Sequence, residues 1–157
     1  MTGFAIGEDG DEVSVTPFRG VVDTGGPNMG LPKEIVEPYF ASFGGVPAAG
    51  ASHIFPCDRY PPPALVLKMV SGDSLVLNST WLVAGAISPW NNGSCHGRVD
   101  DSLQTSYNIG ACVLDQKFVV FDHANSRIGF ADKASLAAET HDSEPACTGA
   151  ANSPVMI

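Results

Sequence analysis

The residues best suited to chemistry lie in the stretch 21–26, which reads Val-Val-Asp-Thr-Gly-Gly. Asp23 supplies a carboxylate, a candidate acid–base group. The two valines favour an extended, buried strand and the glycines permit a tight bend, so Asp23 is presented at a strand end with fixed geometry. An Asp-Thr-Gly stretch equally suits an Asx turn at the end of a strand. These residues alone therefore leave a catalytic and a purely structural role open.

The histidines and cysteines suggest a second kind of chemistry. His53, Cys57, Cys95 and His96 are zinc-ligand types, but Cys95 and His96 are adjacent and the set lacks the paired turns of structural zinc sites. We therefore expect no metal. All four histidines of the chain fall in predicted loops, and none neighbours a nucleophile, so each is expected to be a solvated or turn residue. No nucleophile elbow indicates a serine hydrolase.

The composition indicates a domain of short strands. The 157 residues suffice for one domain with a core, or for one lobe of something larger. Hydrophobic residues make up 44% and charged residues 16%, while 17 glycines and 12 prolines interrupt the apolar runs before long helices could form. These features predict an all-β fold with a few short helices.

Charge and short motifs limit the partners and the compartment. The net charge of −9 repels phosphate backbones and anionic membranes, and no segment approaches the ~20 apolar residues of a membrane helix, so we expect neither nucleic-acid nor membrane binding. N-glycosylation patterns at Asn78 and Asn92, with four cysteines, indicate a secreted or vacuolar/lysosomal protein. The N-terminus lacks a signal peptide, as expected for a mature piece of a longer precursor.

Periodicity and turn residues predict the order of elements. Residues 3–22 predict a hairpin that leads into the Asp23 strand, and residues 31–44 an amphipathic helix that kinks or divides at Pro38. Residues 44–63 predict an irregular excursion. Strands are expected at 64–70, 74–77, 81–87, 109–114, 117–122 and 127–131. The composition then shifts, which predicts a lobe over 1–131 and a C-terminal tail over 132–157 that is packed on the lobe or linked to it.

Several separated motifs occur in an order and spacing that together are specific. They are Val-Val-Asp-Thr-Gly at 21–25 followed by Leu31-Pro32 and a helix, Phe-Pro-Cys at 55–57, Gly-Ser-Cys-His-Gly at 93–97, Asn-Ile-Gly at 108–110, and the strand pair within 118–131. Over residues 3–131 the chain resembles the C-terminal lobe of pepsin-like aspartic proteases. The resemblance implies orthogonally packed antiparallel sheets, with a ψ-shaped strand crossing around the Asp-Thr-Gly loop that is closed by Ile109-Gly110.

The resemblance also implies a reaction. Family members hydrolyse internal peptide bonds at acidic pH through a water held between two carboxylates, and Asp23 would be one of the two. Thr24 would carry the hydroxyl that cross-links the two active-site loops. Gly25 and Gly26 would complete the substrate-binding loop, and the ligand would be a peptide substrate or a pepstatin-type inhibitor. No cofactor is implied.

Half of such a site is missing from the sequence. No second Asp-Thr-Gly or Asp-Ser-Gly occurs, and no candidate for the substrate-covering flap is found. A complementary N-terminal lobe on a second chain is the expected partner. A fragment consisting of one lobe and a symmetric homodimer are the alternatives.

The chain departs from the family pattern directly after Asp-Thr-Gly. Family members usually have Ser or Thr there, whose hydroxyl binds the catalytic carboxylate, whereas this chain has Gly26 and Pro27. Loss of a hydrogen bond to the charged form makes ionisation harder, which predicts a changed acid-limb pH dependence. In the extreme case the chain would be a catalytically weak or inactive lobe that binds peptides or proteins.

The resemblance also implies a disulfide. Cys57 and Cys95 match the positions of the bridge found in this lobe across the family. Such a bridge would close a loop of about 40 residues and stabilise the folded chain by roughly 3–4 kcal/mol on a chain-entropy model. Cys112 lies in a predicted buried strand and Cys147 in the tail. Their pairing would fix the tail to the body; otherwise Cys112 is a buried thiol.

Overall fold

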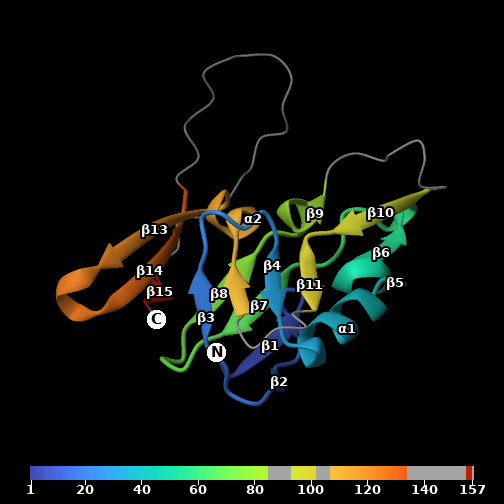
Figure 1. Ribbon diagram of the computed structural model, residues 1–157. Coiled ribbons are helices and arrows are strands. Elements are labelled where there is room, and N and C mark those ends of the chain that lie inside the picture. The colour runs from blue at the N-terminus through green and yellow to red at the C-terminus, as the bar shows by residue number, and fades with distance from the viewer. Residues whose placement is uncertain (85–92, 102–106, 134–154, 157) are drawn as a thin grey trace, which may run out of the picture.

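The computed structural model describes residues 1–84, 93–101, 107–133 and 155–156, and these are mostly β-strands with few helices (Figure 1). The prediction of an all-β fold is confirmed. The described strands form four small sheets. In the described ranges, no helix has the length and apolar character needed to cross a membrane.

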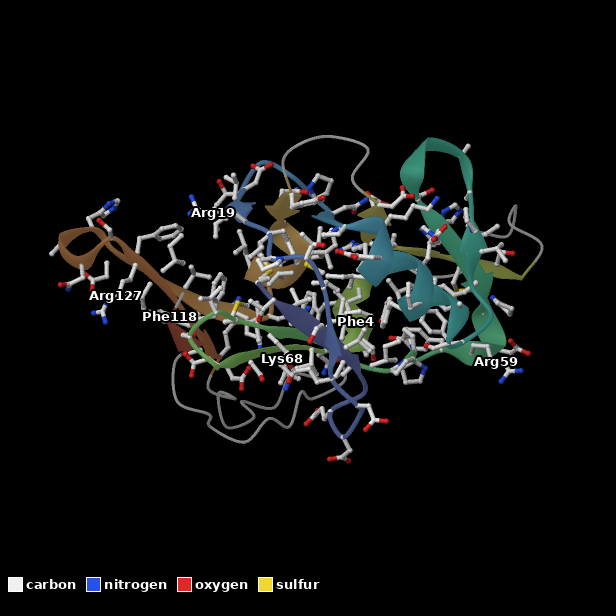
Figure 2. The ribbon with its side chains drawn as sticks, turned by 90° about the horizontal axis from the view of Figure 1, so that it is seen from below. Phe4, Arg19, Arg59, Lys68, Phe118 and Arg127 are labelled. Atoms are coloured by element: carbon white, nitrogen blue, oxygen red, sulfur yellow. A yellow bond between two sulfur atoms is a disulfide. The ribbon has the colours of Figure 1, made fainter. Side chains whose placement is uncertain are left out.

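The first sheet joins part of the predicted N-terminal hairpin to the predicted strands at 64–70 and 74–77 in the antiparallel order β2-β1-β7-β8. Its strands are β1 (Gly3–Ile6), β2 (Val13–Ser14), β7 (Leu65–Lys68) and β8 (Ser74–Leu77). Phe4 pairs with Leu67, and both side chains are fully buried. Figure 2 shows Phe4 within the dense side chains of the body. This sheet therefore contributes a large part of the hydrophobic core.

The second sheet has the antiparallel order β5-β6-β10-β9, with strands β5 (Val46–Pro47), β6 (His53–Pro56), β9 (Val83–Ala84) and β10 (Ser94–Gly97). Two of these strands lie in the segment 44–63, so the prediction of an irregular excursion there is wrong. His53 and Phe55 alternate with less buried neighbours, as in a half-buried strand. The surrounding Gly, Ala and Pro residues obscured this short alternation.

The helix α1 (Lys33–Ala41) lies where the amphipathic pattern predicts it. It begins after Pro32 and buries Ile35, Val36, Tyr39 and Phe40. Pro38 lies inside one continuous helix and does not divide it. Because Pro38 and Glu34 both face solvent, the carbonyl that the missing N–H would have bonded remains open to water.

His53 corrects the prediction that every histidine is solvated. The residue is 1% exposed, and its ring stacks on Phe40 with ring centroids 4.6 Å apart. Both ring nitrogens are buried without a hydrogen-bond partner. Burial lowers the pKa of His53, and the nearby charges of Asp101, Glu37 and Asp100 oppose this shift, while Lys33 adds to it.

The third sheet contains the predicted crossing. Its order is β11-β4-β12-β3, with strands β3 (Gly20–Val22), β4 (Met29–Leu31), β11 (Val99–Asp101) and β12 (Tyr107–Ile109). Strand β12 lies between β3 and β4, parallel to β3 and antiparallel to β4. The two strands joined by the Asp-Thr-Gly loop are therefore separated by a strand from about 80 residues further along the chain.

The edge strand β3 is less buried than its sequence predicts. Val21 is 60% exposed, and Val22 is half-buried. β3 is an edge strand, with a neighbour in this sheet on one side only among the described strands.

The fourth sheet is built on a hairpin, β13 (Lys117–Asp122) and β14 (Arg127–Asp132), that extends away from the body (Figure 1). The short β15 (Val155–Met156) completes the sheet, in the order β13-β14-β15. An ion pair between Lys117 and Asp132 joins the base of the hairpin. Figure 2 shows Phe118 and Arg127 on this projecting element.

Two predicted strands are shorter than expected. The predicted strand 109–114 is wrong, because only Ile109 belongs to β12 and the rest forms the helical turn α2 (Ala111–Leu114). Of the predicted strand 81–87, the first two residues lie in a 3-10 helix, Val83 and Ala84 form β9, and the remainder lies outside the described residues. The 3-10 helices are η1 (Ala49–Ala51), η2 (Cys57–Arg59), η3 (Ser79–Leu82) and η4 (His123–Asn125).

Gly110 permits the closest approach in the crossing. A Cβ at this position would lie 2.0 Å from the Asn28 carbonyl oxygen and 2.5 Å from that of Gly26. Its φ of −91° suits any residue, so the requirement is space and not backbone conformation. At Gly20, by contrast, the nearest atom is the flexible end of Met1, at 3.1 Å.

We predict that Gly110→Ala lowers the free energy of unfolding by about 3 kcal/mol or more, because backbone atoms on both sides must move apart. Gly20→Ala is the matched control in the same sheet and should change stability little. Urea denaturation followed by circular dichroism measures both. Equal midpoints for the two variants would contradict the prediction.

Candidate active site

Asp23 is the first residue after β3 and is still held by the crossing strand. Its backbone N–H donates to the Ile109 carbonyl oxygen at 3.0 Å. The Gly25 N–H donates to Asp23 Oδ1 at 2.9 Å, which is an Asx turn, and the side chain is half-buried. The structural interpretation of this stretch is thus correct, and it is compatible with the catalytic one. The turn fixes Oδ1 and leaves Oδ2 for another partner.

The loop is also held by α2. The Ala111 N–H donates to the Gly26 carbonyl oxygen at 2.7 Å, and the Cys112 N–H donates to that of Pro27 at 3.2 Å. No side chain caps α2, so loop carbonyls satisfy two of its first N–H groups. The loop and α2 therefore form one hydrogen-bonded unit.

The other predicted site residues of this loop, Thr24, Gly25 and Gly26, directly follow Asp23 and differ in exposure. Thr24 and Gly25 are exposed, and Gly26 is half-buried. The Thr24 hydroxyl makes no hydrogen bond within the described part of the chain. The resemblance implies a second active-site loop as its partner, and the sequence contains no second Asp-Thr-Gly or Asp-Ser-Gly.

Three polar residues that the sequence interpretation did not single out support the loop from behind. Asn28 Nδ2 donates to Asp100 Oδ2 at 2.9 Å, and Asn108 Nδ2 donates to the Asn28 carbonyl oxygen at 3.2 Å. Asn108 is a polar residue within the otherwise apolar motif at 108–110, a signal that was available, whereas Asn28 gave none. Asp100 is 72 residues from Asn28 in the sequence and gave no such signal.

The Asp100 carboxylate is half-buried and only partly satisfied by hydrogen bonds. Its Oδ1 is buried without a hydrogen-bond partner. Burial raises the pKa of Asp100, with a smaller contribution from the Asp101 charge, while the Asn28 hydrogen bond and the nearby His53 oppose the shift.

The cysteines follow the pattern that the resemblance implied. Cys57 and Cys95 form a disulfide with Cα atoms 5.1 Å apart, next to the pairing of β6 with β10. Since both thiols are used, neither is available to zinc. Cys112 is a buried free thiol on α2, and burial raises its pKa to about 11. Cys147, its predicted partner, lies outside the described residues.

The remaining site predictions are placed only in part. Asn78 is exposed and precedes η3, where its Oδ1 accepts a hydrogen bond from the Thr80 N–H at 3.0 Å. Asn92 lies outside the described residues. No group of three or more His, Cys, Asp or Glu side chains within the described ranges could hold a metal ion.

We predict that Asp100→Asn stabilises the chain more at pH 7 than at pH 3. The raised pKa means that the wild-type stability is fully present below the usual value of 3.8 and is lost as the pH rises through the folded-state value. A carboxamide stays neutral, and its oxygen can still accept from Asn28. Urea midpoints measure the difference, with the exposed Asp58→Asn as control for charge loss. A difference that does not change with pH would contradict the prediction.

Known proteins are similar in sequence to most of this chain. The family model described as eukaryotic aspartyl protease matches residues 1–133. Penicillopepsin-3 of Penicillium janthinellum is 33% identical over 135 residues, which cover 83% of this chain and 32% of that protein. Endothiapepsin of Cryphonectria parasitica is 30% identical over 136 residues, covering 84% of this chain and 31% of that protein. The chain spans about a third of the length of these relatives, and it belongs to the eukaryotic aspartyl protease family.

Proposed function

We propose that this chain is the C-terminal lobe of an acid endopeptidase, in which Asp23 is one of two catalytic carboxylates. The observation that carries the proposal is the way Asp23 is held. Its main chain is bonded to the crossing strand at Ile109, and its Oδ1 to Gly25. A carboxylate fixed by elements far apart in sequence has the rigidity that acid–base catalysis requires.

The proposed reaction is amide hydrolysis by an activated water. One carboxylate, ionised, accepts a proton from the water, while the other, protonated, donates to the substrate carbonyl oxygen. Two adjacent carboxyl groups differ in proton affinity because both cannot ionise easily, as is established for aspartic proteases in general. Since Oδ1 of Asp23 accepts from Gly25, its Oδ2 is the oxygen that would face the water.

The second carboxylate would come from a complementary N-terminal lobe. The sequence contains one Asp-Thr-Gly, and the chain covers about a third of the length of its relatives. The exposed hydroxyl of Thr24 would bond to the corresponding loop of that lobe. Peptide substrates and pepstatin-type inhibitors would bind between the two lobes.

The hairpin offers a surface on which this lobe could dock. Phe118 and Val120 lie two residues apart on β13, are 61% and 41% exposed, and share one face. Their paired residues on β14 are Ala131 and Gly129, which leave the face flat. We define Phe118 and Val120 as the docking face. The other edge of β13 has no neighbouring strand among the described residues.

An oxidising compartment fits the proposal. The Cys57–Cys95 disulfide is typical of secreted and vacuolar or lysosomal proteins and unusual in reducing compartments. Glycosylation at the exposed Asn78 would be consistent with the same route.

Gly26 favours a second candidate function, a lobe that binds peptides or proteins with little turnover. With no side chain at this position, no hydroxyl from residue 26 can bond to the catalytic carboxylate. The two candidates differ in turnover and not in binding.

We predict that Asp23→Asn reduces peptide hydrolysis roughly a thousandfold or more, since the pair of carboxylates acts as a unit. The chain is combined with its complementary lobe and assayed on a denatured protein substrate across acidic pH, with and without a pepstatin-type inhibitor. Asp9→Asn, at an exposed turn position, is the control. Inhibitor binding without wild-type turnover would favour the binding function, and full activity of Asp23→Asn would overturn the proposal.

We predict that Phe118→Asp weakens association with the complementary lobe at least about tenfold, because a charge would replace a large apolar contact. Val70→Asp is the control, since Val70 is 78% exposed in the β7–β8 turn. Isothermal titration calorimetry measures the affinities, and urea midpoints confirm that both variants fold. Unchanged affinity of a folded Phe118→Asp variant would exclude this face as the docking site.

A further inference from the structure

The absence of a side chain at Gly26 leaves no empty space beside Asp23. A Cβ built on Gly26 would lie 2.8 Å from Asp23 Oδ2 and 3.0 Å from Asn108 Nδ2. The carboxylate oxygen, from the end of β3, and the amide nitrogen, from β12, thus approach the same point. A larger residue at 26 would have to displace one of them.

Asn108 is fixed in the middle of the third sheet. Its residue pairs with Val21 of β3 on one side and with Gly30 of β4 on the other. Ile109 is buried in the core. Asn108 directly precedes it in the strand and therefore faces the opposite side of the sheet.

One hydrogen bond sets the orientation of the Asn108 carboxamide. Nδ2 donates to the Asn28 carbonyl oxygen at 3.2 Å, and only the nitrogen end of the amide can donate. The nitrogen, and not the amide oxygen, is therefore turned toward the loop that carries Asp23. A primary amide has two N–H groups, and this bond uses one of them.

Asp23 Oδ2 lacks a donor. Oδ1 accepts from the Gly25 N–H, whereas no hydrogen bond to Oδ2 occurs within the described part of the chain. Among the described residues Asn108 Nδ2 makes one hydrogen bond and so keeps a second N–H, and its nitrogen and Asp23 Oδ2 lie 3.0 and 2.8 Å from the same point beside Gly26. Catalytic hydrogen bonds commonly tighten when substrate binds.

We propose that Asn108 is a positioning residue whose second Nδ2 N–H donates to Asp23 Oδ2 and replaces the hydroxyl that Gly26 lacks. This inference rests on the proposed catalytic role of Asp23. The amide holds the ionised carboxylate in place and favours its charged form. The missing hydroxyl at position 26, which suggests a weak enzyme, is thereby compensated by the Asn108 amide of β12.

The first test needs no activity and uses the chain itself. Side-chain NMR signals of the Asn108 amide and of the Asp23 carboxyl carbon are recorded from pH 2 to 7. We expect the amide signal to follow the Asp23 titration and to lose that transition in Asp23→Asn, while Asp9→Asn leaves it unchanged. An Asn108 signal that stays flat, or one that moves equally in Asp23→Asn, overturns the proposal.

The second test uses the chain assembled with its complementary lobe. Asn108→Ala should move the acid limb of kcat/KM to higher pH by about one unit, with little change in KM. Gly26→Ser combined with Asn108→Ala should return the acid limb of kcat/KM to its wild-type pH, because removing the amide leaves room for a hydroxyl donor. Gly26→Ser alone should not improve activity, since its Cβ would be wedged between Asp23 Oδ2 and Asn108 Nδ2, whereas removal of the amide lets the carboxylate and the new side chain move apart.

Controls separate this proposal from the proposed function. Asn125→Ala, at the distant hairpin tip, should leave the pH profile unchanged. If no variant hydrolyses peptides although the NMR coupling is present, the proposed function fails and the role of Asn108 stands. If the enzyme is active and Asn108→Ala leaves the acid limb in place, the role of Asn108 fails and the function stands.

Discussion

The insertion of β12 between β3 and β4 is the constraint on which the site depends. Without it, residues 20–31 would form an ordinary hairpin whose loop could fluctuate by itself. With it, the Asp23 N–H bonds to Ile109 and the Gly26 carbonyl bonds to Ala111, more than 80 residues away. The position of one carboxylate is therefore tied to the integrity of the whole third sheet. Local loosening of the loop requires these long-range hydrogen bonds to break as well.

Two titratable groups, Asp100 and His53, respond to acid in opposite directions. The pKa of Asp100 is raised by burial, so acidification favours its folded environment. The pKa of His53 is lowered by burial, so the unfolded chain takes up a proton more readily and stability falls as the pH drops below the usual value of 6.5. On passing to acidic pH, the folded state thus gains stability at Asp100 and loses stability at His53. The net effect of acid on stability is therefore a balance between these two groups.

Much of the fold could be predicted from sequence because its signals are local. The apolar stripe of α1, the turn at Gly72 and the strand pair around residues 123–126 each depend on neighbouring residues. Asp23 was identified by its motif, although the motif alone could not separate a catalytic role from an Asx turn. The errors arose where tertiary contacts decide. α2 is helical because loop carbonyls satisfy its first N–H groups, and His53 is buried because Phe40 stacks on it.

The partners of the site residues were the least predictable part. Asn28, Asp100 and Asn108 come from three separate strands or strand ends and meet only because of the crossing. No spacing rule links them, since the distances along the chain are set by intervening elements. A polar residue inside an apolar motif was the one available hint, at Asn108.

The exposed apolar residues are consistent with a chain that is one part of a larger protein. Strands at sheet edges are normally protected by charges, proline or a covering segment. Here the edge strand β3 exposes Val21, and the edge strand β13 exposes Phe118 and Val120. These two edges belong to different sheets, yet one carries Asp23 at its end and the other forms the projecting hairpin (Figure 1). A lobe that covered both edges would bury apolar surface and, at the same time, bring its own loop to Asp23. Assembly and completion of the active site would then be one event, driven by surface that is otherwise unfavourably exposed.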